Sequence, residues 1–211
     1  MVVSFVESCP STQEELIFML KNAVITPPYA LVASTQTNGV GSRGHSWQSD
    51  EGNLYFSFCI NENDLANDVE TASASIYFAS LMGEFLKSCG SKLWIKWPND
   101  FYLGDKKIGG VITTKIKSVY VCGMGINLKK SPSFANILDI DISVPNIVDG
   151  FINYLNLKIS WKQIFSKYLI EFEKSRVFNT HIDGELTSLR DAILLNDGSI
   201  MIKDKKVYSL R

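Results

Sequence analysis

The sequence has no apolar segment long enough to cross a membrane. Its longest apolar stretches, Leu54–Ile60 and Ile76–Met82, are about seven residues long and include serine, whereas a spanning helix needs about 20 apolar residues. The first nine residues also lack a basic segment ahead of an apolar run, so they do not form a secretory signal. We therefore expect a soluble, cytoplasmic protein without a membrane partner.

Neither sign of charge is in excess, and cysteine is scarce. The 211 residues include 21 Lys+Arg and 22 Asp+Glu, and a net charge of −1 gives no general attraction to nucleic acid. The four cysteines form no Cys-x-x-Cys pair, and only two histidines accompany them. Zinc ligands usually come in close pairs, so we expect reduced thiols and no metal cluster. With 45% hydrophobic residues, the chain can bury a full core.

Strand and helix patterns alternate along the chain. Apolar alternation predicts a half-buried strand over Asn53–Ile60, and Asn67 or Asp68 can begin a buried helix that runs to about residue 88. An apolar stripe after Ser160 predicts a further helix. The other predicted elements are strands at 2–7, 29–36, 93–96, 101–103, 106–117, 119–123, 192–195, 199–202 and 206–211, a helix from about 11, and a loop with helical turns over 131–150. This order favours an α+β fold around a largely antiparallel mixed sheet flanked by helices, rather than a doubly wound sheet.

A polar loop between two predicted strands carries Gly39, Gly41 and Gly44. Because glycine has no Cβ, backbone amides in this loop can approach a ligand closely, and grouped amides suit anionic groups. Arg43 can add a bidentate contact to phosphate or carboxylate, and Trp47 offers a flat face to a ring. The loop leads into a strand, not a helix, so it is neither a dinucleotide fingerprint nor a Walker loop. Taken alone, it is also compatible with an ordinary surface loop.

Two further segments combine residues in an unusual way. The run Lys96-Trp97-Pro98-Asn99-Asp100 precedes a strand that contains Lys107-Ile108-Gly109-Gly110-Val111. Two glycines weaken a strand unless something approaches its backbone closely. A lysine beside them can neutralise charge on a phosphoryl or carboxyl oxygen, and an aspartate beside a turn can hold Mg²⁺. The run Gly123-Met124-Gly125-Ile126-Asn127 ends a strand with an asparagine that can contact an adenine or a phosphate.

Together these segments resemble the biotin protein ligase family, the biotin–[acetyl-CoA-carboxylase] ligases. The resemblance extends from about residue 5 to residue 128, in the family's order. Its most specific part is Lys96–Asp100, which reproduces the family's Lys-Trp-Pro-Asn-Asp in full. The other matching segments are Ser11–Gln13 at a Ser-Thr-Asn-like turn, Gln36–Trp47 at the glycine-rich loop, Lys107–Val111 at a Lys-Leu-x-Gly-Ile strand, and Gly123–Asn127 at a Gly-x-Gly-Ile-Asn strand end.

The resemblance implies a fold and a two-step reaction. The fold is the biotin/lipoate ligase catalytic domain, similar to class II aminoacyl-tRNA synthetases, over residues 1–181. A shortened SH3-like β segment would follow over residues 182–211. The biotin carboxylate would attack the α-phosphate of ATP, giving biotinyl-5′-AMP and pyrophosphate. A lysine of biotin carboxyl carrier protein, an acetyl-CoA carboxylase subunit, would then displace AMP.

The resemblance also assigns residues to this reaction. Lys107, Arg43 and Asp100 would be catalytic, with Lys107 acting electrostatically and Asp100 serving Mg²⁺. The biotin site would consist of Ser11, Thr12, Gln13, Gln36, Gly39, Val40, Gly41, Ser42, Lys107, Gly109 and Gly110. The ATP and adenylate site would consist of Arg43, Gly44, His45, Trp47, Asn99 and Asn127.

The glycine-rich loop departs from the family's Gly-Arg-Gly-Arg-x-Gly-Arg pattern. Val40, Ser42 and His45 replace three of the usual arginines, and Arg43 remains. Those arginines are expected to order the loop over the adenylate. We therefore expect this chain to retain biotinyl-AMP less well than relatives with more arginines.

Other functions are compatible with parts of the sequence. A lipoate–protein ligase-like acyl-adenylate transferase would share the fold, although the Trp-Pro-Asn-Asp string favours biotin. A sensor of biotinyl-AMP is a second alternative. The resemblance starts close to Met1, where repressor-type members have a helix-turn-helix domain, so we expect no nucleic-acid partner. A plain nucleotide-binding module would not explain Lys107 beside two strand glycines. The resemblance also allows a homodimer.

Overall fold

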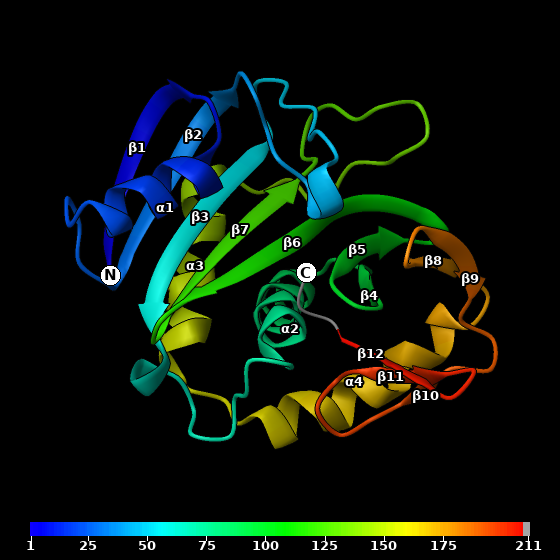
Figure 1. The fold of residues 1–211 in the computed structure, drawn as a ribbon. Coiled ribbons are helices and arrows are strands. Elements are labelled where there is room, and N and C mark those ends of the chain that lie inside the picture. The colour runs from blue at the N-terminus through cyan, green and yellow to red at the C-terminus, as the bar shows by residue number, and fades with distance from the viewer. Residues whose placement is uncertain (209–211) are drawn as a thin grey trace.

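The computed structural model describes residues 1–208 and, among them, every side chain except that of Arg43. Its centre is a seven-stranded mixed sheet in the order β1-β2-β3-β7-β6-β5-β4 (Figure 1). β1 pairs with β2 in parallel, and the other neighbours are antiparallel. The strands are β1 (Val2–Cys9), β2 (Tyr29–Gln36), β3 (Leu54–Asn61), β4 (Trp94–Lys96), β5 (Asp100–Leu103), β6 (Lys106–Ile116) and β7 (Val119–Ile126). The predicted α+β class with a largely antiparallel sheet is confirmed.

The sheet has apolar side chains on both faces. α1 (Thr12–Lys21) covers one face, where Leu16 packs with Leu31 and Val121. α2 (Ala74–Ser88) and α3 (Val144–Asn156) cover the other face. Because side chains alternate along a strand, Phe56 and Phe58 of β3 face α2 and α3, while Cys59 faces the α1 side.

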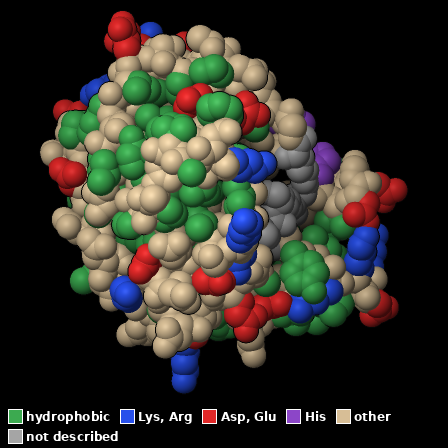
Figure 2. All heavy atoms as spheres, turned by 60° about the vertical axis from the view of Figure 1, so that its left-hand side comes forward, with side chains coloured by type: hydrophobic (Ala, Val, Ile, Leu, Met, Phe, Trp, Pro, Cys, Tyr) green, Lys and Arg blue, Asp and Glu red, His purple; other side chains and the backbone are tan. Residues whose placement is uncertain are grey.

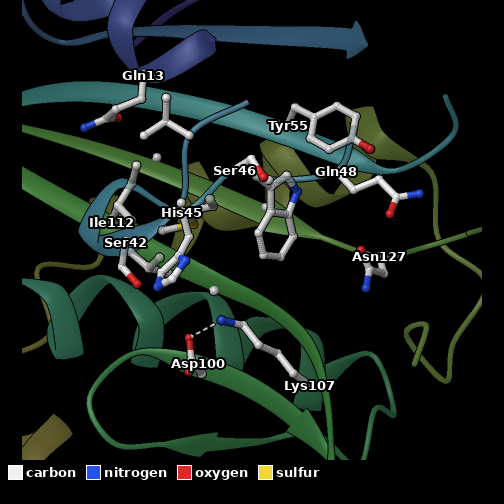
Figure 3. Close-up of a pocket in the computed structure, with 18 of the residues that line it drawn as sticks. Gln13, Ser42, His45, Ser46, Gln48, Tyr55, Asp100, Lys107, Ile112 and Asn127 are labelled. Carbon is white, nitrogen blue, oxygen red and sulfur yellow. Dashed lines mark ion pairs between the residues drawn. The ribbon is translucent and has the colours of Figure 1, made fainter. Parts of the chain in front are cut away.

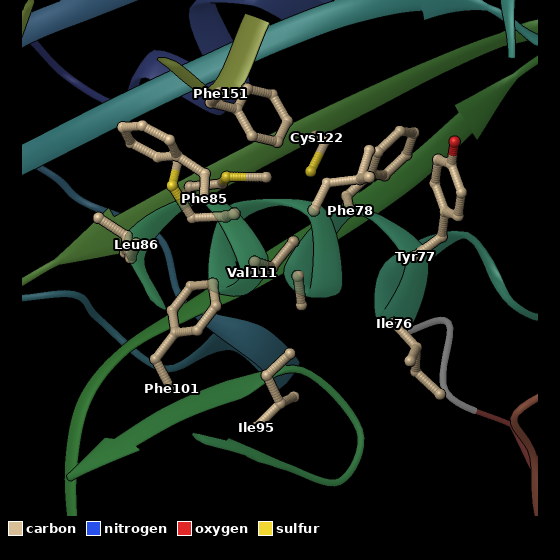
Figure 4. Close-up of a cluster of buried hydrophobic side chains, with 14 of the residues drawn as sticks. Ile76, Tyr77, Phe78, Phe85, Leu86, Ile95, Phe101, Val111, Cys122 and Phe151 are labelled. Atoms are coloured by element: carbon tan, nitrogen blue, oxygen red, sulfur yellow. The ribbon is translucent and has the colours of Figure 1, made fainter. Parts of the chain in front are cut away.

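The α2 side holds the main core, where aromatic rings interlock (Figure 4). The ring centroids of Phe58 and Phe78 lie 5.1 Å apart, and those of Phe56 and Phe151 lie 5.6 Å apart, both edge to face. Trp97 is also fully buried in this core. Close packing in this core holds the sheet and α2 in a fixed position, so the opposite face of the sheet, on the α1 side, is a firm support.

α2 begins at Ala74, so the predicted start at Asn67 or Asp68 is wrong. The Asp68 carboxylate instead accepts hydrogen bonds from the Trp161 amide at 2.8 Å and the Lys162 amide at 3.0 Å, at the start of α4 (Trp161–Ser175). An aspartate that satisfies the free amides of a distant helix is not available to cap its own segment.

Residues 131–150 contain more helix than predicted. α3 is a full helix of 13 residues, with the Ser143 hydroxyl accepting from the Asn146 amide and Pro145 in its first turn. Its buried face consists of Ile147, Val148, Phe151 and Leu155, which is a helical spacing. β7 also runs to Ile126, three residues beyond the predicted strand.

Two small sheets follow α4. β8 (Asn179–Ile182) pairs with β9 (Glu185–Ser188), and β10 (Ile193–Leu194), β11 (Ile200–Ile202) and β12 (Lys205–Val207) form the other sheet. The predicted domain boundary between residues 181 and 182 falls inside β8. The last residues of the predicted strand over 206–211, residues 209–211, lie outside the described part of the chain.

The second of these sheets is bound to the large sheet's core through a turn. The Trp97 indole donates to the Gly198 carbonyl at 2.9 Å, and the Trp161 indole donates to the Asn196 carbonyl at 2.7 Å. Gly198 has φ +81°, and a Cβ there would lie 2.7 Å from Ile76 Cδ1. Glycine is thus required both by the backbone conformation and by the close contact.

Apolar side chains are exposed around β1 and α1, the side that Figure 2 brings forward. Val2 and Phe5 of β1, Phe18 of α1 and Val24 just after it are each more than half exposed. None of the helices within residues 1–208 is both long and apolar enough to span a membrane.

Candidate active site

A cavity of about 690 Å³ opens on the α1 side of the sheet (Figure 3). Sites for small molecules in proteins usually measure roughly 300 to 1,000 Å³. The cavity is lined by the start of α1, the loop over residues 40–48, strands β3, β5, β6 and β7, and a segment at 132–135. It therefore brings together all three segments that the sequence singled out.

The floor of the cavity is built around two glycines of β7 and their cross-strand neighbours. Gly123 pairs with Ser57 on one side and Ile112 on the other, and Gly125 pairs with Tyr55 and Gly110. A Cβ on Gly123 would lie 2.8 Å from Gln13 Oε1, which is closer than real Cβ contacts. Glycine is required here because other side chains already occupy the space above the strand.

One end of the cavity carries a connected set of polar groups. The Gln36 side-chain oxygen accepts from the Thr12 amide at 2.8 Å and from the Thr12 hydroxyl at 3.2 Å. The Thr12 and Ser57 hydroxyls lie 2.8 Å apart, and the Gln36 Nε2 donates to the Ser49 hydroxyl at 3.0 Å. These bonds fix the orientation of the side chains, so the wall presents donors and acceptors in set directions.

Gln13 lies beside this set but is held differently. Its Nε2 donates to the Val121 carbonyl at 3.1 Å, and its Oε1 is buried with no donor among the residues that the structure describes. The side chain borders the cavity at the Ile112 end, opposite Asn127 (Figure 3). A buried acceptor without a partner carries a desolvation cost.

The glycine-rich loop folds back on itself. The Gly41 amide donates to the His45 carbonyl at 2.7 Å, and the Trp47 amide donates to the Gly39 carbonyl at 2.7 Å. Between them lies a single 3₁₀ turn, Ser42–Gly44, which the sequence did not predict. The side chain of Arg43, predicted to be catalytic, lies outside the described part of the structure.

Trp47 lies against the backbone of β7. A Cβ on Gly125 would be 2.7 Å from Trp47 Cε2, so the indole rests directly on the strand. Lys107 Nζ lies 5.8 Å from the centroid of this indole, within the range of a cation–π contact. The indole N–H is buried and has no acceptor among the described residues.

Lys107 and Asp100 form the charged pair of the site. Lys107 Nζ lies 2.7 Å from Asp100 Oδ1, and the lysine side chain is 35% exposed, so it faces the cavity (Figure 3). A Cβ on Gly110 would lie 3.0 Å from that carboxylate oxygen, so glycine makes room for the pair. Nearby, burial and the charge of Asp100 raise the pKa of Tyr102 to about 12, which keeps its phenol protonated.

The Lys96–Asp100 segment is held from behind by core residues. The Trp97 amide donates to the Ser175 hydroxyl at 3.0 Å, and the Asn99 side chain donates to the Ser75 hydroxyl at 2.7 Å and the Val111 carbonyl at 2.6 Å. Asn99 is buried, and only Asp100 of this segment borders the cavity. The side chain of Asn99, predicted to bind the nucleotide, therefore does not line the cavity; it fixes the strand beneath it.

The structure brings most of the predicted site residues to one cavity. Those that line it are Ser11, Thr12, Gln13, Gln36, Val40, Gly41, Ser42, His45, Trp47, Asp100, Lys107, Gly110 and Asn127. Gly39, Gly44 and Gly109 do not line it. Gly109 faces the neighbouring strand, where a Cβ would meet the Gly125 carbonyl oxygen at 2.5 Å, so glycine is required here for close strand packing.

Several lining residues were not predicted from the sequence. They are Ser46, Gln48, Tyr55, Ser57, Tyr102, Asp105, Val111, Ile112, Gly123, Met124, Gly125, Pro132, Phe134 and Ala135. The alternation over 53–60 already carried the signal for Tyr55 and Ser57, because they occupy the face opposite the apolar one. No local pattern indicated Pro132 or Phe134, which reach the cavity through the path of a loop.

Comparisons with known proteins agree with this geometry. The sequence profile described as "Biotin/lipoate A/B protein ligase family" matches residues 6–131. The "Bifunctional ligase/repressor BirA" of Bacillus subtilis is 26% identical over 178 residues, which is 81% of this chain and 53% of that protein. The protein of the same name from Escherichia coli is 36% identical over 107 residues, 47% of this chain and 32% of that protein. The chain thus spans about half the length, or less, of these curated relatives.

Solved structures extend the likeness to the whole chain. The biotin acetyl coenzyme A carboxylase synthetase of Helicobacter pylori, solved with bound biotinylated ATP, is 42% identical, with a TM-score of 0.93 over 98% of both chains. The biotin protein ligase of Aquifex aeolicus, in complex with biotin and ATP, is 24% identical, with a TM-score of 0.75 over 100% of this chain and 96% of that one. The second of these supports the fold alone.

Proposed function

Because this chain belongs to the biotin/lipoate A/B protein ligase family, we propose that it activates biotin with ATP and transfers the biotinyl group to a lysine of a biotin carboxyl carrier domain. The observation that carries this proposal is the Lys107–Asp100 pair, set between a polar end of the cavity and an end bordered by Trp47 and Asn127. In biotinyl-AMP, a carboxylate is joined to a phosphate. With biotin at the polar end and the nucleotide at the other end, this bond would lie beside the Lys107–Asp100 pair.

The polar end suits the ring of biotin. A cyclic urea has a carbonyl acceptor and two N–H donors, and none can be buried unpaired without a penalty. The hydroxyl and amide groups of Thr12, Gln36 and Ser57 are oriented by their own bonds and offer both kinds of partner. The dithiolane ring of lipoate has no urea and could not use the donors and acceptors that these groups still present to the cavity, which favours biotin over lipoate.

In the first step, a biotin carboxylate oxygen attacks the α-phosphorus of ATP. A new P–O bond forms, the bond to the bridging oxygen breaks, and pyrophosphate leaves with that electron pair. Negative charge gathers on the oxygens around phosphorus, and the Lys107 ammonium offsets it from a fixed position. Asp100 holds Lys107 at the cavity wall before ligands arrive, so little reorganisation is required.

In the second step, the neutral amine of the carrier lysine attacks the carbonyl carbon of biotinyl-AMP. The C–N bond forms, the C–O bond to phosphate breaks, AMP leaves with the electron pair, and the amine loses a proton to solvent. The adenosine half would lie against Trp47, whose indole is already supported by Gly125. Asn127, buried at the end of β7, borders the same half of the cavity.

Mg²⁺ would enter with the nucleotide. Magnesium keeps several waters and is usually held by one or two carboxylates plus substrate phosphates. Asp100 and Asp105 both border the cavity and supply carboxylate oxygens, so the residues fit an ion brought by ATP. Within residues 1–208 no group of three acidic, histidine or cysteine side chains could hold an ion unaided.

The test is a transfer assay with purified chain, ATP, Mg²⁺ and a biotin carboxyl carrier domain. We expect streptavidin-detectable label on the carrier that needs both biotin and ATP. Modification with lipoate but not biotin would assign the protein to lipoate transfer. Formation of biotinyl-AMP without any transfer would instead support a sensor of the adenylate.

A further inference from the structure

Asn53, the residue just before β3, binds the chain that leaves β7. Its Oδ1 accepts hydrogen bonds from three successive backbone amides, those of Leu128 at 2.8 Å, Lys129 at 3.0 Å and Lys130 at 3.2 Å. Its Nδ2 donates to the Lys130 carbonyl at 2.9 Å. The side chain is 3% exposed. This single carboxamide therefore provides the hydrogen-bond partners of the backbone groups in the bend.

Three successive amides that point to one spot form a concave donor site of the kind that usually binds an anion. Here the site is already filled by the Asn53 side-chain oxygen. The bend after β7 is therefore closed from within, and its shape depends on a residue 75 positions earlier in the chain. Asn53 itself does not line the cavity.

Asn127, the residue directly before the bend, does line the cavity. The Asn127 amide donates to the Ile108 carbonyl at 2.8 Å, and its carbonyl accepts from the Leu138 amide at 2.8 Å. Its side-chain Nδ2 donates to the Asn136 carbonyl at 3.1 Å. The Asn136 amide in turn donates to the Lys107 carbonyl at 3.0 Å. Through Asn136, these bonds join Asn127 to the backbone of Lys107, and the peptide bond between Asn127 and Leu128 joins Asn127 to the bend that Asn53 holds.

The same bend starts the segment that reaches Pro132, Phe134 and Ala135 on the cavity wall. By contrast, the polar end of the cavity is held by bonds among Thr12, Gln36 and Ser57, and none of those bonds involves the bend. Figure 3 shows the two ends separated across the cavity, with Gln13 and Ile112 on one side and Asn127 on the other.

We propose that Asn53 is a positioning residue for the nucleotide half of the site. It places Asn127 and the wall at 132–135 without touching a ligand, and it leaves the biotin half unchanged. This inference rests on the proposed function, because it names the half of the cavity that takes the nucleotide. Its consequence is a selective effect: a change at Asn53 weakens ATP binding and spares biotin binding.

The test uses two variants and a matched control. Asn53→Leu keeps the size of the side chain and removes all four bonds, whereas Asn53→Asp keeps an oxygen for the three amides and loses the donor to Lys130. The control is Asn61→Leu at the other end of β3, where the side chain donates to Asp64 at 3.1 Å. The readouts are the KM values for ATP and biotin from biotin-dependent pyrophosphate release, and the melting temperature.

We expect Asn53→Leu to raise the KM for ATP at least about tenfold, because misplacement of a binding wall by a fraction of an ångström is costly. In Asn53→Leu the KM for biotin should stay within about twofold of its original value. Asn53→Asp should raise the KM for ATP measurably, but less than Asn53→Leu does. Asn61→Leu should change neither KM value. If Asn53→Leu does not fold, the ATP-selective effect of Asn53→Asp decides the matter.

Equal increases in both KM values, or an unchanged KM for ATP in both Asn53 variants, would overturn the positioning role. These outcomes differ from a failure of the proposed function. In that case the unaltered chain would show no biotin-dependent pyrophosphate release, and the premise of the inference would be lost with it.

Discussion

The contact between Trp47 and Gly125 supports a quantitative prediction. A methyl group added by Gly125→Ala would lie 2.7 Å from Cε2, 2.8 Å from Nε1 and 2.9 Å from Cζ2 of the indole. An ordinary contact of this kind begins at 3.4 Å, so the ring must retreat from the strand by about 0.7 Å or more. Gly125 is paired with Gly110 of β6 in regular strand register, so alanine fits its backbone and the ring is what moves.

The displaced ring moves into the half of the cavity that we assign to the nucleotide. A misplacement of about 1 Å can cost roughly 100-fold in rate, which corresponds to about 2.7 kcal/mol at 1.36 kcal/mol per factor of ten. We therefore expect Gly125→Ala to lower kcat/KM for ATP by about 100-fold, with a melting temperature close to that of the unaltered chain. The assay is biotin-dependent pyrophosphate release at varied ATP.

A double-mutant cycle separates this cause from a general disturbance of β7. In a Trp47→Ala background the new methyl group has no ring to displace, so Gly125→Ala should cost little beyond Trp47→Ala alone. A full additional loss in that background would refute the reasoning, as would a Gly125→Ala protein with unchanged kcat/KM for ATP.

Further predictions concern the charged pair, the loop and the small C-terminal sheet. Lys107→Met should slow adenylate formation by about 10²- to 10³-fold, whereas Lys106→Met, at an exposed neighbour, should not; equal effects would contradict the assignment. Because the loop has few arginines, Ser42→Arg should lengthen the half-life of bound biotinyl-AMP in a stopped-flow release assay; an unchanged half-life would argue against the idea. Partial burial acts to raise the pKa of Asp197, but hydrogen bonds from Lys206 and Ser199 lower it overall. The stability it contributes is therefore present above the unfolded pKa of about 3.9 and lost as pH falls through the lower folded value, so Asp197→Asn should flatten the acid side of a melting-temperature profile.

Local sequence patterns predicted the elements whose stabilising residues lie within them. The alternation over 53–60 corresponds to β3, the apolar stripe after Ser160 to α4, and the helix predicted from about residue 11 to α1. The patterns failed where contact with a residue far away in the sequence determines where a helix begins. Asp68 looks like the cap of the next helix in the chain but caps α4, because tertiary packing brings Trp161 beside it.

The candidate site shows the same division. Residue type and motif order indicated Lys107, Asp100, Gln36 and Trp47, because the chemistry of each side chain can be recognised from the sequence alone. Asn99 carries the same functional group as Asn127 and lies in an equally distinctive motif, yet it is buried beneath the strand and binds Ser75. Only the direction of the side chain relative to the sheet separates the two.

By itself, the sequence determined the α+β class, the three functional segments and the family they resemble, since these depend on periodicity and on residue types in order. The tertiary structure alone decided which side chains share one cavity, and that the Asn53 carboxamide closes the bend after β7. Hydrogen bonds between residues far apart in the chain leave no periodic mark, because they depend on the register of strands and the path of loops. Those long-range bonds position the groups that chemistry requires.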